Sequence, residues 1–378
     1  MHAVISGAGV AGLALAGRLA RDGWSVEVVE RAPEPRASGY LVDFFGPGFD
    51  AAERMGVLPA LRARAESFDE LRTVDAWGKV RARLPISLVE RAARGRYLTI
   101  LRPQIVAALT EALPGAVRIR WGTQVEAVHD DGTRAHVLLS DGERVAADLL
   151  VGADGVGSRV RRLVWGPADD VVRPLGDLTA VAWIGDDARL HHDLDGMVAM
   201  QVEQDRQLVV APLGDSGVTG FAVLRGVGAA DARRALIGMG ALGRRAVRGI
   251  RDPYVDAVAQ TVVEPWVRGR VVLLGDACAA VSLLAGQGAS LAIAGAERLA
   301  EELAFARHPS DVAAGLSAYE REWRPVIERE QARGRRVQAT FAPHSRLELE
   351  AQRAAWRAAA LPGVAHLIAR AGGVTKTR

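Results

Sequence analysis

The chain has 378 residues, of which 49% are hydrophobic and 25% charged, and its net charge is +3. This composition predicts a globular protein with one or two cores. The isoelectric point of about 9.4 comes almost wholly from arginines interleaved with acids, and with only 5% aromatic residues the composition argues against a nucleic-acid-binding surface.

Cysteine, histidine and glycine usage limits the kind of site and the location. Cys278 is the only cysteine, which excludes intramolecular disulfides and multi-thiolate metal sites and is compatible with the cytoplasmic location that we predict. We expect the His191-His192 pair in a surface loop, and no metal site is predicted. Glycines interrupt the apolar segment 3–20, so we predict neither a signal peptide nor a membrane span.

The N-terminal segment predicts a strand, a glycine loop, a helix, a second strand and an acid, in that order. Residues 3–6 read as a buried strand, and "GAGVAG" (7–12) follows. A helix is expected over 13–22 and a strand over 25–29, with Glu30 at its end. This order is typical of a dinucleotide-binding unit.

The glycines and the acid have separate roles in such a unit. Gly7, Gly9 and Gly12 allow a tight turn, close approach of a pyrophosphate and close helix packing, while the helix start offers free N–H groups to the phosphates. Glu30 is placed to accept hydrogen bonds from an adenosine ribose. The nucleotide is FAD or NAD(P) on this evidence; Glu30 disfavours a 2′-phosphate, although Arg31 beside it weakens that argument.

Two further motifs follow apolar strands. "DLLVGADGVGSR" (148–159) leads into Asp154, with a helix expected to begin near Ser158. "VVLLGDACAAVSLLAGQGASL" (271–291) brings Asp276 to the edge of an apolar core, where a carboxylate is costly to bury without partners. A helix is expected after "GQG" (286–288).

These three motifs, in order and spacing, resemble those of the FAD-dependent aromatic hydroxylases, the class A flavoprotein monooxygenases with the para-hydroxybenzoate hydroxylase fold. The resemblance extends from residue 1 to about residue 330. "GYLVDFFGPGFDAAERMGVL" (39–58) and "YEREWRP" (319–325) are most similar to the subset that includes tetracycline-inactivating monooxygenases. The chain has no second strand–GxGxxG–helix unit, so a pyridine nucleotide would bind only transiently.

The resemblance and the residue patterns together predict an α/β fold. We expect a Rossmann-like FAD-binding domain of the GR2/PHBH type, an interleaved antiparallel-sheet substrate domain and C-terminal helices. A helix is predicted over 229–250, another over 311–341, and a further helical segment over 345–371 that breaks at Pro362-Gly363. The predicted boundaries are 1–66, 98–170 and 265–310 for the FAD-binding domain, 67–97 and 171–264 for the substrate domain, and 311–378 for the C-terminal helical segment.

The resemblance also implies a set of cofactor contacts. Asp276 would bind the ribityl hydroxyls, Arg102 in "LRPQIVAAL" would reach the flavin from a helix start, and Asp43 would lie beside it. Asp154 and Asp43 are also compatible with capping roles, and Arg102 with a surface helix start. The predicted cofactor residues are Gly7, Gly9, Ala11, Gly12, Glu30, Arg31, Asp43, Arg102, Asp154, Gly275, Asp276, Gly286, Gln287, Gly288 and Ala289, and those expected nearest the flavin ring are Leu283, Gly286 and Gln287.

The implied function is an FAD-dependent, NAD(P)H-consuming monooxygenase. It would hydroxylate an aromatic or polyketide-like small molecule through a flavin hydroperoxide formed with molecular oxygen, as in secondary metabolism or antibiotic inactivation. Ala279 and Leu283 stand where the family often has His and Pro. Two alternatives therefore stay open: an FAD-dependent oxidase or dehydrogenase on the same fold, and a non-catalytic flavin-binding module. The sequence names no catalytic base and leaves monomer and dimer open.

The substrate cavity is expected against the predicted sheet of residues 178–225. Alternation along the strands offers five candidate lining residues, although a core position is the preferred interpretation for each because alternation does not say which face meets a ligand. They are Trp183, Met197, Met200, Phe221 and Val223.

Overall fold

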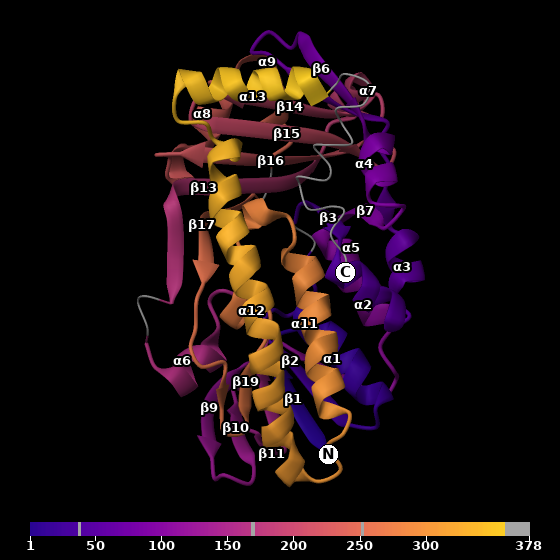
Figure 1. Ribbon diagram of the computed structural model, residues 1–378, viewed down its shortest axis with the longest axis vertical. Helices are drawn as coiled ribbons and strands as arrows, with labels where there is room; N and C mark the ends of the chain where they lie inside the picture. The colour runs from indigo at the N-terminus through magenta and orange to yellow at the C-terminus, as the bar shows by residue number, and fades with distance from the viewer. Residues whose placement is uncertain (37–38, 168–170, 251–252, 360–378) are drawn as a thin grey trace.

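The computed structural model describes residues 1–36, 39–167, 171–250 and 253–359. The predicted break at Pro362-Gly363 lies outside these residues. The described strands form four sheets, with the nucleotide-type sheet at one end of an elongated molecule and the largest sheet at the other (Figure 1). No helix within the described ranges is both long and apolar enough to cross a bilayer.

A mostly parallel sheet of six strands carries the N-terminal unit. Its core strands are buried apolar runs, as expected for strands covered on both faces. Only β18 pairs antiparallel, at the edge. The spatial order is β18 (Val267–Arg268), β19 (Val271–Leu273), β12 (Leu149–Gly152), β1 (His2–Ser6), β2 (Ser25–Glu30) and β8 (Arg118–Trp121).

Helices and a small sheet complete this end of the molecule. The helix α1 (Val10–Arg21) begins at the glycine loop and packs against α11 (Gly288–Leu303). An antiparallel sheet comprises β11 (Arg144–Ala147), β10 (Ala135–Leu139) and β9 (Val125–Asp130). The main apolar core lies around β1, β12 and β19 and extends into α1 and α11.

The largest sheet has seven strands and forms the far end. It is antiparallel except that β14 pairs parallel with β5, so the purely antiparallel sheet expected from the sequence is wrong at this pair. The order is β17 (Tyr254–Thr261), β13 (Val172–Asp186), β16 (Gly217–Arg225), β15 (Arg206–Leu213), β14 (Val198–Glu203), β5 (Glu70–Val74) and β6 (Val80–Pro85).

Short helices cover one face of this sheet, where the sequence predicted a single helix over 229–250. The segment instead forms η1 (Ala229–Asp231), α8 (Ala232–Ile237) and α9 (Gly240–Ala246). The helix breaks because Gly240 has a φ of +83° and packs so closely on Ala76 that a Cβ would lie 2.2 Å from its carbonyl oxygen.

The histidine pair also differs from its prediction. His191 and His192 lie on α7 (Ala188–Leu194) rather than in a loop or strand, and His191 Nε2 lies 2.8 Å from the Gly214 carbonyl oxygen. No group of three potential metal ligands occurs among the residues that the structure describes.

A second small sheet lies between the two ends, with helices around it (Figure 1). It comprises β3 (Leu41–Phe45), β7 (Tyr97–Leu101) and β4 (Ala65–Glu66). The segment 67–97, which the sequence predicted to be strand-like, contains β5, β6 and also α4 (Ile86–Ala92). The nearby helices are α2 (Pro47–Arg54), α3 (Leu58–Arg62) and α5 (Arg102–Glu111).

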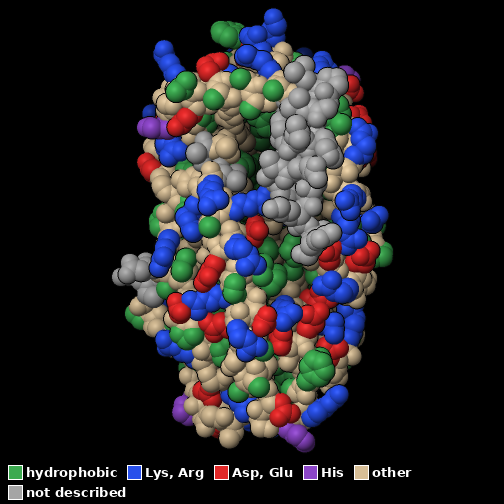
Figure 2. Space-filling model, in the orientation of Figure 1, with side chains coloured by type: hydrophobic (Ala, Val, Ile, Leu, Met, Phe, Trp, Pro, Cys, Tyr) green, Lys and Arg blue, Asp and Glu red, His purple; other side chains and the backbone are tan. Residues whose placement is uncertain are grey.

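Two long C-terminal helices complete the fold and confirm the predicted helices there. α12 (Pro309–Phe341) runs along the molecule from the six-stranded to the seven-stranded sheet, and α13 (Arg346–Ala359) crosses the far end (Figure 1). Charged side chains of both signs are interspersed over this face (Figure 2). The predicted α/β fold class is therefore confirmed, while the exact domain boundaries stay a prediction.

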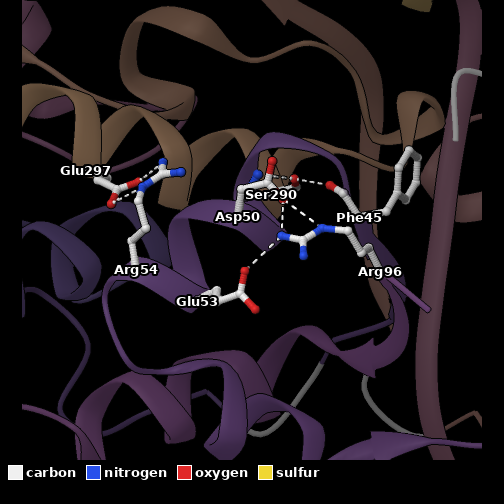
Figure 3. Close-up of polar contacts among 8 residues, drawn as sticks. Phe45, Asp50, Glu53, Arg54, Arg96, Ser290 and Glu297 are labelled. Atoms are coloured by element: carbon white, nitrogen blue, oxygen red, sulfur yellow. Dashed lines mark hydrogen bonds and ion pairs between the residues drawn. The ribbon is translucent and has the colours of Figure 1, made fainter. Parts of the chain in front are cut away.

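Ion pairs fix α2 against α11 (Figure 3). Arg54 Nε donates to Glu297 Oε1 at 2.9 Å, and a second bond of 2.5 Å joins the same two groups. Glu297 is only 2% exposed, so its carboxylate depends on Arg54 for neutralisation. Arg96 similarly contacts Asp50 and Glu53 on α2. At the start of α11, the Ser290 hydroxyl donates to the Phe45 carbonyl oxygen of β3 at 2.5 Å and accepts the Gly48 N–H of α2 at 3.0 Å, which holds both elements against this helix (Figure 3).

We expect Arg54→Ala to destabilise the protein by about 2 kcal/mol, because the buried Glu297 carboxylate loses both charged hydrogen bonds. Urea unfolding measures the change. Arg321→Ala, which removes a solvent-exposed pair with Glu322, is the control and should cost no more than about 0.5 kcal/mol. Equal effects of the two variants would contradict the buried-clamp interpretation.

Candidate functional site

The three sequence motifs meet at the carboxyl ends of the parallel strands. Gly7 has a φ of +111°, and a Cβ on it would lie 2.5 Å from the Ala153 carbonyl oxygen in the second motif. Gly275 has a φ of +61°, and a Cβ on it would lie 2.8 Å from the Ala11 Cβ. Only glycine satisfies both the conformation and the spacing at these positions. The first motif thus packs directly on the other two.

Two helix starts at this junction have free N–H groups. α1 is preceded by Gly9 and α11 by Gln287, and neither of these residues supplies a side-chain cap. A Cβ built on Gly9, Gly286 or Gly288 would meet nothing within 4 Å. Open space therefore lies in front of both glycine segments, where uncapped helix starts favour negative charge. Ala289 is the second residue of α11.

Glu30 ends β2 and holds the glycine loop. Its two carboxylate oxygens accept the N–H groups of Ala8 and Ala32, each at 2.9 Å. The Glu30 side chain stays partly exposed, so each oxygen retains acceptor capacity for a ribose hydroxyl. Arg31 is exposed beside it. Ribose binding by Glu30 and Arg31 stays a prediction.

Asp276 is the first residue of the short helix α10 (Asp276–Ala279). Its carboxylate has no hydrogen-bond or ion-pair partner among the described residues. The pKa of Asp276 is raised because burial disfavours the charged form, and the nearby Arg102 charge partly offsets this effect. Arg102 begins α5, as the sequence predicted, and its backbone N–H donates to the Tyr40 carbonyl oxygen at 3.0 Å. The Asp276 side chain is partly solvent-accessible, so an acceptor free of protein partners points into an open recess.

Asp154 is saturated by local contacts. It accepts the Ser158 hydroxyl and the N–H groups of Arg159 and Val160 at the start of α6 (Arg159–Trp165). This geometry confirms its capping role, and a cofactor contact by Asp154 stays a prediction.

Arg161, which the sequence reasoning missed, joins the second motif to the third. This buried guanidinium donates to the Val156 and Ala277 carbonyl oxygens, each at 2.6 Å. Burial lowers its pKa. Arg161 lies three residues after Ser158, the residue that caps the start of α6, and this spacing in the sequence could have drawn attention to it.

Asp43 lies on β3 with its side chain exposed, yet burial raises its pKa. These two observations agree if the carboxylate faces a recess that water enters but that protein largely surrounds. Asp43 Oδ1 accepts the Tyr97 phenol at 2.6 Å and the Thr99 hydroxyl at 3.3 Å. Asp43 therefore does not cap a turn but joins a polar cluster on the β3–β7 wall.

The loop between α10 and α11 has strained geometry that the sequence did not reveal. Ser282 has a φ of +100°, rare for a residue with a side chain, and its hydroxyl accepts the Leu284 N–H at 3.1 Å. Leu283 begins η2 (Leu283–Ala285), and Leu283 and Phe221 each pack, partly buried, against the apolar cluster that contains Val223. Cys278 is buried, and burial raises the pKa of its thiol, so it packs as a small hydrophobic side chain.

The candidate cavity residues divide between the two faces of the largest sheet. Trp183 is fully buried beneath the short helices, which confirms its interpretation as a core residue. Met197 is buried on the same side of the sheet, where it lines a small cavity with residues of α7 and α9, and a substrate contact by Met197 stays a prediction. Phe221 and Val223 belong to the opposite face, which packs against Leu283. Of these two only Phe221 remains partly exposed. Met200 is buried.

These residues fit FAD. The open glycine segment before α1 suits a pyrophosphate, Glu30 suits the adenosine ribose, and the unpartnered Asp276 suits the ribityl hydroxyls. The partly exposed apolar residues Leu283 and Phe221 suit a flat aromatic ring system. The fold and the site therefore define a flavin-dependent oxidoreductase.

Comparison with known proteins gives the family. The model described as "FAD binding domain" matches residues 1–227 and 252–333. The chain is 30% identical over 368 residues to the FAD-dependent monooxygenase asL6 of Sarocladium schorii, covering 86% of this chain and 84% of that protein. It is 31% identical over 323 residues to 3-hydroxybenzoate 6-hydroxylase 1 of Aquipseudomonas alcaligenes, covering 79% and 80%.

The chain belongs to this FAD-binding family, and within it to the class A flavoprotein monooxygenases. Solved structures agree on the fold. The crystal structure of the tetracycline destructase Tet(51) has a TM-score of 0.80 and 24% identity, covering 100% of this chain and 99% of that chain.

We expect Asp276→Ala to purify largely as apoprotein. Loss of a charged acceptor for sugar hydroxyls corresponds to about 1.5–3 kcal/mol, or roughly 10- to 150-fold in FAD affinity. The flavin absorbance per chain measures retention. Asp215→Ala, in an exposed turn, is the matched control and should stay yellow. A fully yellow Asp276→Ala protein would remove Asp276 from the cofactor site.

We also expect Glu30→Ala to weaken FAD binding about tenfold, because it removes a ribose acceptor and releases the Ala8 N–H of the glycine loop. Titration of apoprotein with FAD, followed by flavin fluorescence, gives the dissociation constant. Glu34→Ala, at an exposed neighbouring position, should match the wild type. An unchanged affinity in Glu30→Ala would show that Glu30 makes no contact with the nucleotide.

Proposed function

We propose that this flavoprotein monooxygenase takes electrons from NADH or NADPH and inserts one oxygen atom into an aromatic or polyketide-like small molecule. The observation that carries the proposal is that the unpartnered Asp276 carboxylate lies near Tyr40, whose ring contacts that of Phe221, and that all three side chains are partly exposed. The names of the relatives, an aromatic hydroxylase and a monooxygenase among them, support the same chemistry.

The chain's own residues would bind and orient the reacting groups. FAD, once reduced, supplies the activation of molecular oxygen. The uncapped N–H groups at the start of α11 offer a fixed positive dipole end for negative charge on the ring. Asp276 and Arg102 would hold the cofactor chain that connects the ring to the nucleotide. Apolar neighbours such as Leu283 and Phe221 would exclude water from the reacting edge.

The alternatives on this fold remain an oxidase or dehydrogenase and a non-catalytic flavin-binding module. Leu283 is the feature that keeps them open, because it stands at the ring-proximal loop where the resembled family often has proline. Ring-proximal placement of Leu283, Gly286 and Gln287 is part of this proposal. We also propose a cytoplasmic location, on the basis of the single buried cysteine.

Anaerobic mixing tests the proposed function. A panel of phenolic and polyketide aromatics is first screened by thermal shift, and the best stabiliser is mixed with holoenzyme and NADPH or NADH without oxygen. We expect the flavin absorbance to bleach, faster with the aromatic compound present, and product to form only when oxygen is admitted.

Two results would contradict the monooxygenase proposal. Bleaching by the aromatic compound alone, without a nicotinamide, would indicate an oxidase or dehydrogenase. Failure of both nicotinamides to bleach the flavin would indicate a non-catalytic flavin-binding module.

A further inference from the structure

The segment that joins α10 to η2 is strained and lies beside the proposed position of the flavin ring. Residues 280–282 have no regular secondary structure, and Ser282 has a φ of +100°. Asp276 lies before this segment, and Leu283 begins η2 directly after it. Such a backbone conformation persists only where the surrounding structure holds it in place.

Two buried glutamines bind the carbonyl groups of this segment. Gln331 of α12 donates from Nε2 to the Ala280 carbonyl oxygen at 3.1 Å and to the Thr261 carbonyl oxygen of β17 at 2.8 Å. Gln260 of β17 donates from Nε2 to the Val281 carbonyl oxygen at 3.0 Å and to the Gln331 carbonyl oxygen at 2.8 Å. An amide nitrogen carries two hydrogens, so both glutamines use their full donor capacity here.

The surroundings fix the direction of the Gln260 amide. Its Oε1 accepts the Arg335 guanidinium at 2.9 Å, and a reversed amide would turn this oxygen toward two carbonyl oxygens and its N–H groups toward a cation. The backbone of α12 also lies close, because a Cβ on Gly334 would be 2.7 Å from the Val281 carbonyl oxygen. Residues 280–282 are therefore held between α12 and β17 by both packing and hydrogen bonds.

We propose that Gln260 and Gln331 are positioning residues for the flavin. They hold residues 280–282 so that Asp276 and the start of α11 keep the spacing that the cofactor requires. The glutamines act through the backbone of this segment rather than by contact with the flavin. Without them, the segment would have to become ordered when FAD binds, and that ordering lowers affinity. The inference rests on the proposed function, because it takes the loop from α10 to α11 as the wall beside the ring.

Gln201 provides a matched comparison in the same chain. It is also buried, and its Nε2 donates to Glu203 Oε1 at 2.7 Å and to the Met239 carbonyl oxygen. Met239 belongs to the apolar cluster on the side of the sheet that the short helices cover. Replacement of Gln201 therefore removes two similar hydrogen bonds away from residues 280–282.

FAD binding to the apoprotein tests the positioning role without requiring turnover. Gln331→Met keeps a side chain of similar length and removes both donors, so we expect the FAD dissociation constant to rise about tenfold. Hydrogen–deuterium exchange in the apoprotein should become faster over residues 280–288. Gln201→Met should leave this exchange unchanged and the dissociation constant within about twofold of the wild type.

The reduction potential of the bound flavin gives a readout that a merely structural role would not move. A displaced α11 start would stabilise negative charge on the reduced ring less well. We therefore expect a more negative midpoint potential in Gln331→Met, measured against a reference dye, and the wild-type potential in Gln201→Met.

A second pair of variants lies at exposed positions of α12, where substitution rarely prevents folding. Arg335→Met keeps most of the side-chain stem and removes the hydrogen bond that orients Gln260. We expect its FAD dissociation constant to rise about threefold. Arg336→Met, at the neighbouring exposed position, is the control and should bind FAD as the wild type does. This pair decides the question if Gln331→Met does not fold.

The positioning role is overturned if Gln331→Met binds FAD as tightly as the wild type, even with faster exchange over residues 280–288. It is also overturned if Gln201→Met weakens binding equally, or if Arg335→Met and Arg336→Met have the same affinity. Failure of the monooxygenase proposal would look different, because a protein whose flavin no nicotinamide reduces can still require both glutamines to bind FAD.

Discussion

The close approach of neighbouring segments at two glycines, Gly7 and Gly275, is the constraint on which this structure depends. Gly7 lies against the carbonyl of Ala153, and Gly275 lies against the Ala11 Cβ, at distances that admit no side chain. Since both glycines also have positive φ, replacement would add conformational strain to a steric clash. The packing brings the ends of β1, β12 and β19 together and leaves a gap in front of two uncapped helix starts.

Charged and polar side chains have internal partners in the scaffold, whereas those in the recess lack them. In the scaffold, Glu297 is neutralised by Arg54 and the buried Arg161 bonds to two carbonyl oxygens. In the recess, Asp276 and Tyr40 remain without hydrogen-bond partners among the described residues. A folded protein stabilises most buried polar groups internally, so those left unsatisfied in one accessible place indicate where a ligand completes the bonding.

The sequence predicted what depends on local backbone geometry. The glycine loops, Glu30 after β2 and the capped start of α6 need only short-range contacts, so residue type and spacing identify them. The break between α8 and α9 depends on Ala76, more than 150 residues away, and helical periodicity does not contain it. The contact between Tyr40 and Tyr254 requires β17 to lie beside β13. Alternation along β13 does not say which side of the sheet faces the cofactor, so it could not by itself separate a core position from a cavity position for Trp183.

The surroundings of Tyr40 also favour one ionisation state of a bound hydroxyl. Burial is the largest cause of the raised pKa of Tyr40; the Arg102 charge acts to lower this pKa, and the Asp276 and Asp256 charges act to raise it. The same removal from water would disfavour a phenolate placed beside Tyr40. A neutral hydroxyl therefore suits this environment better than its anion.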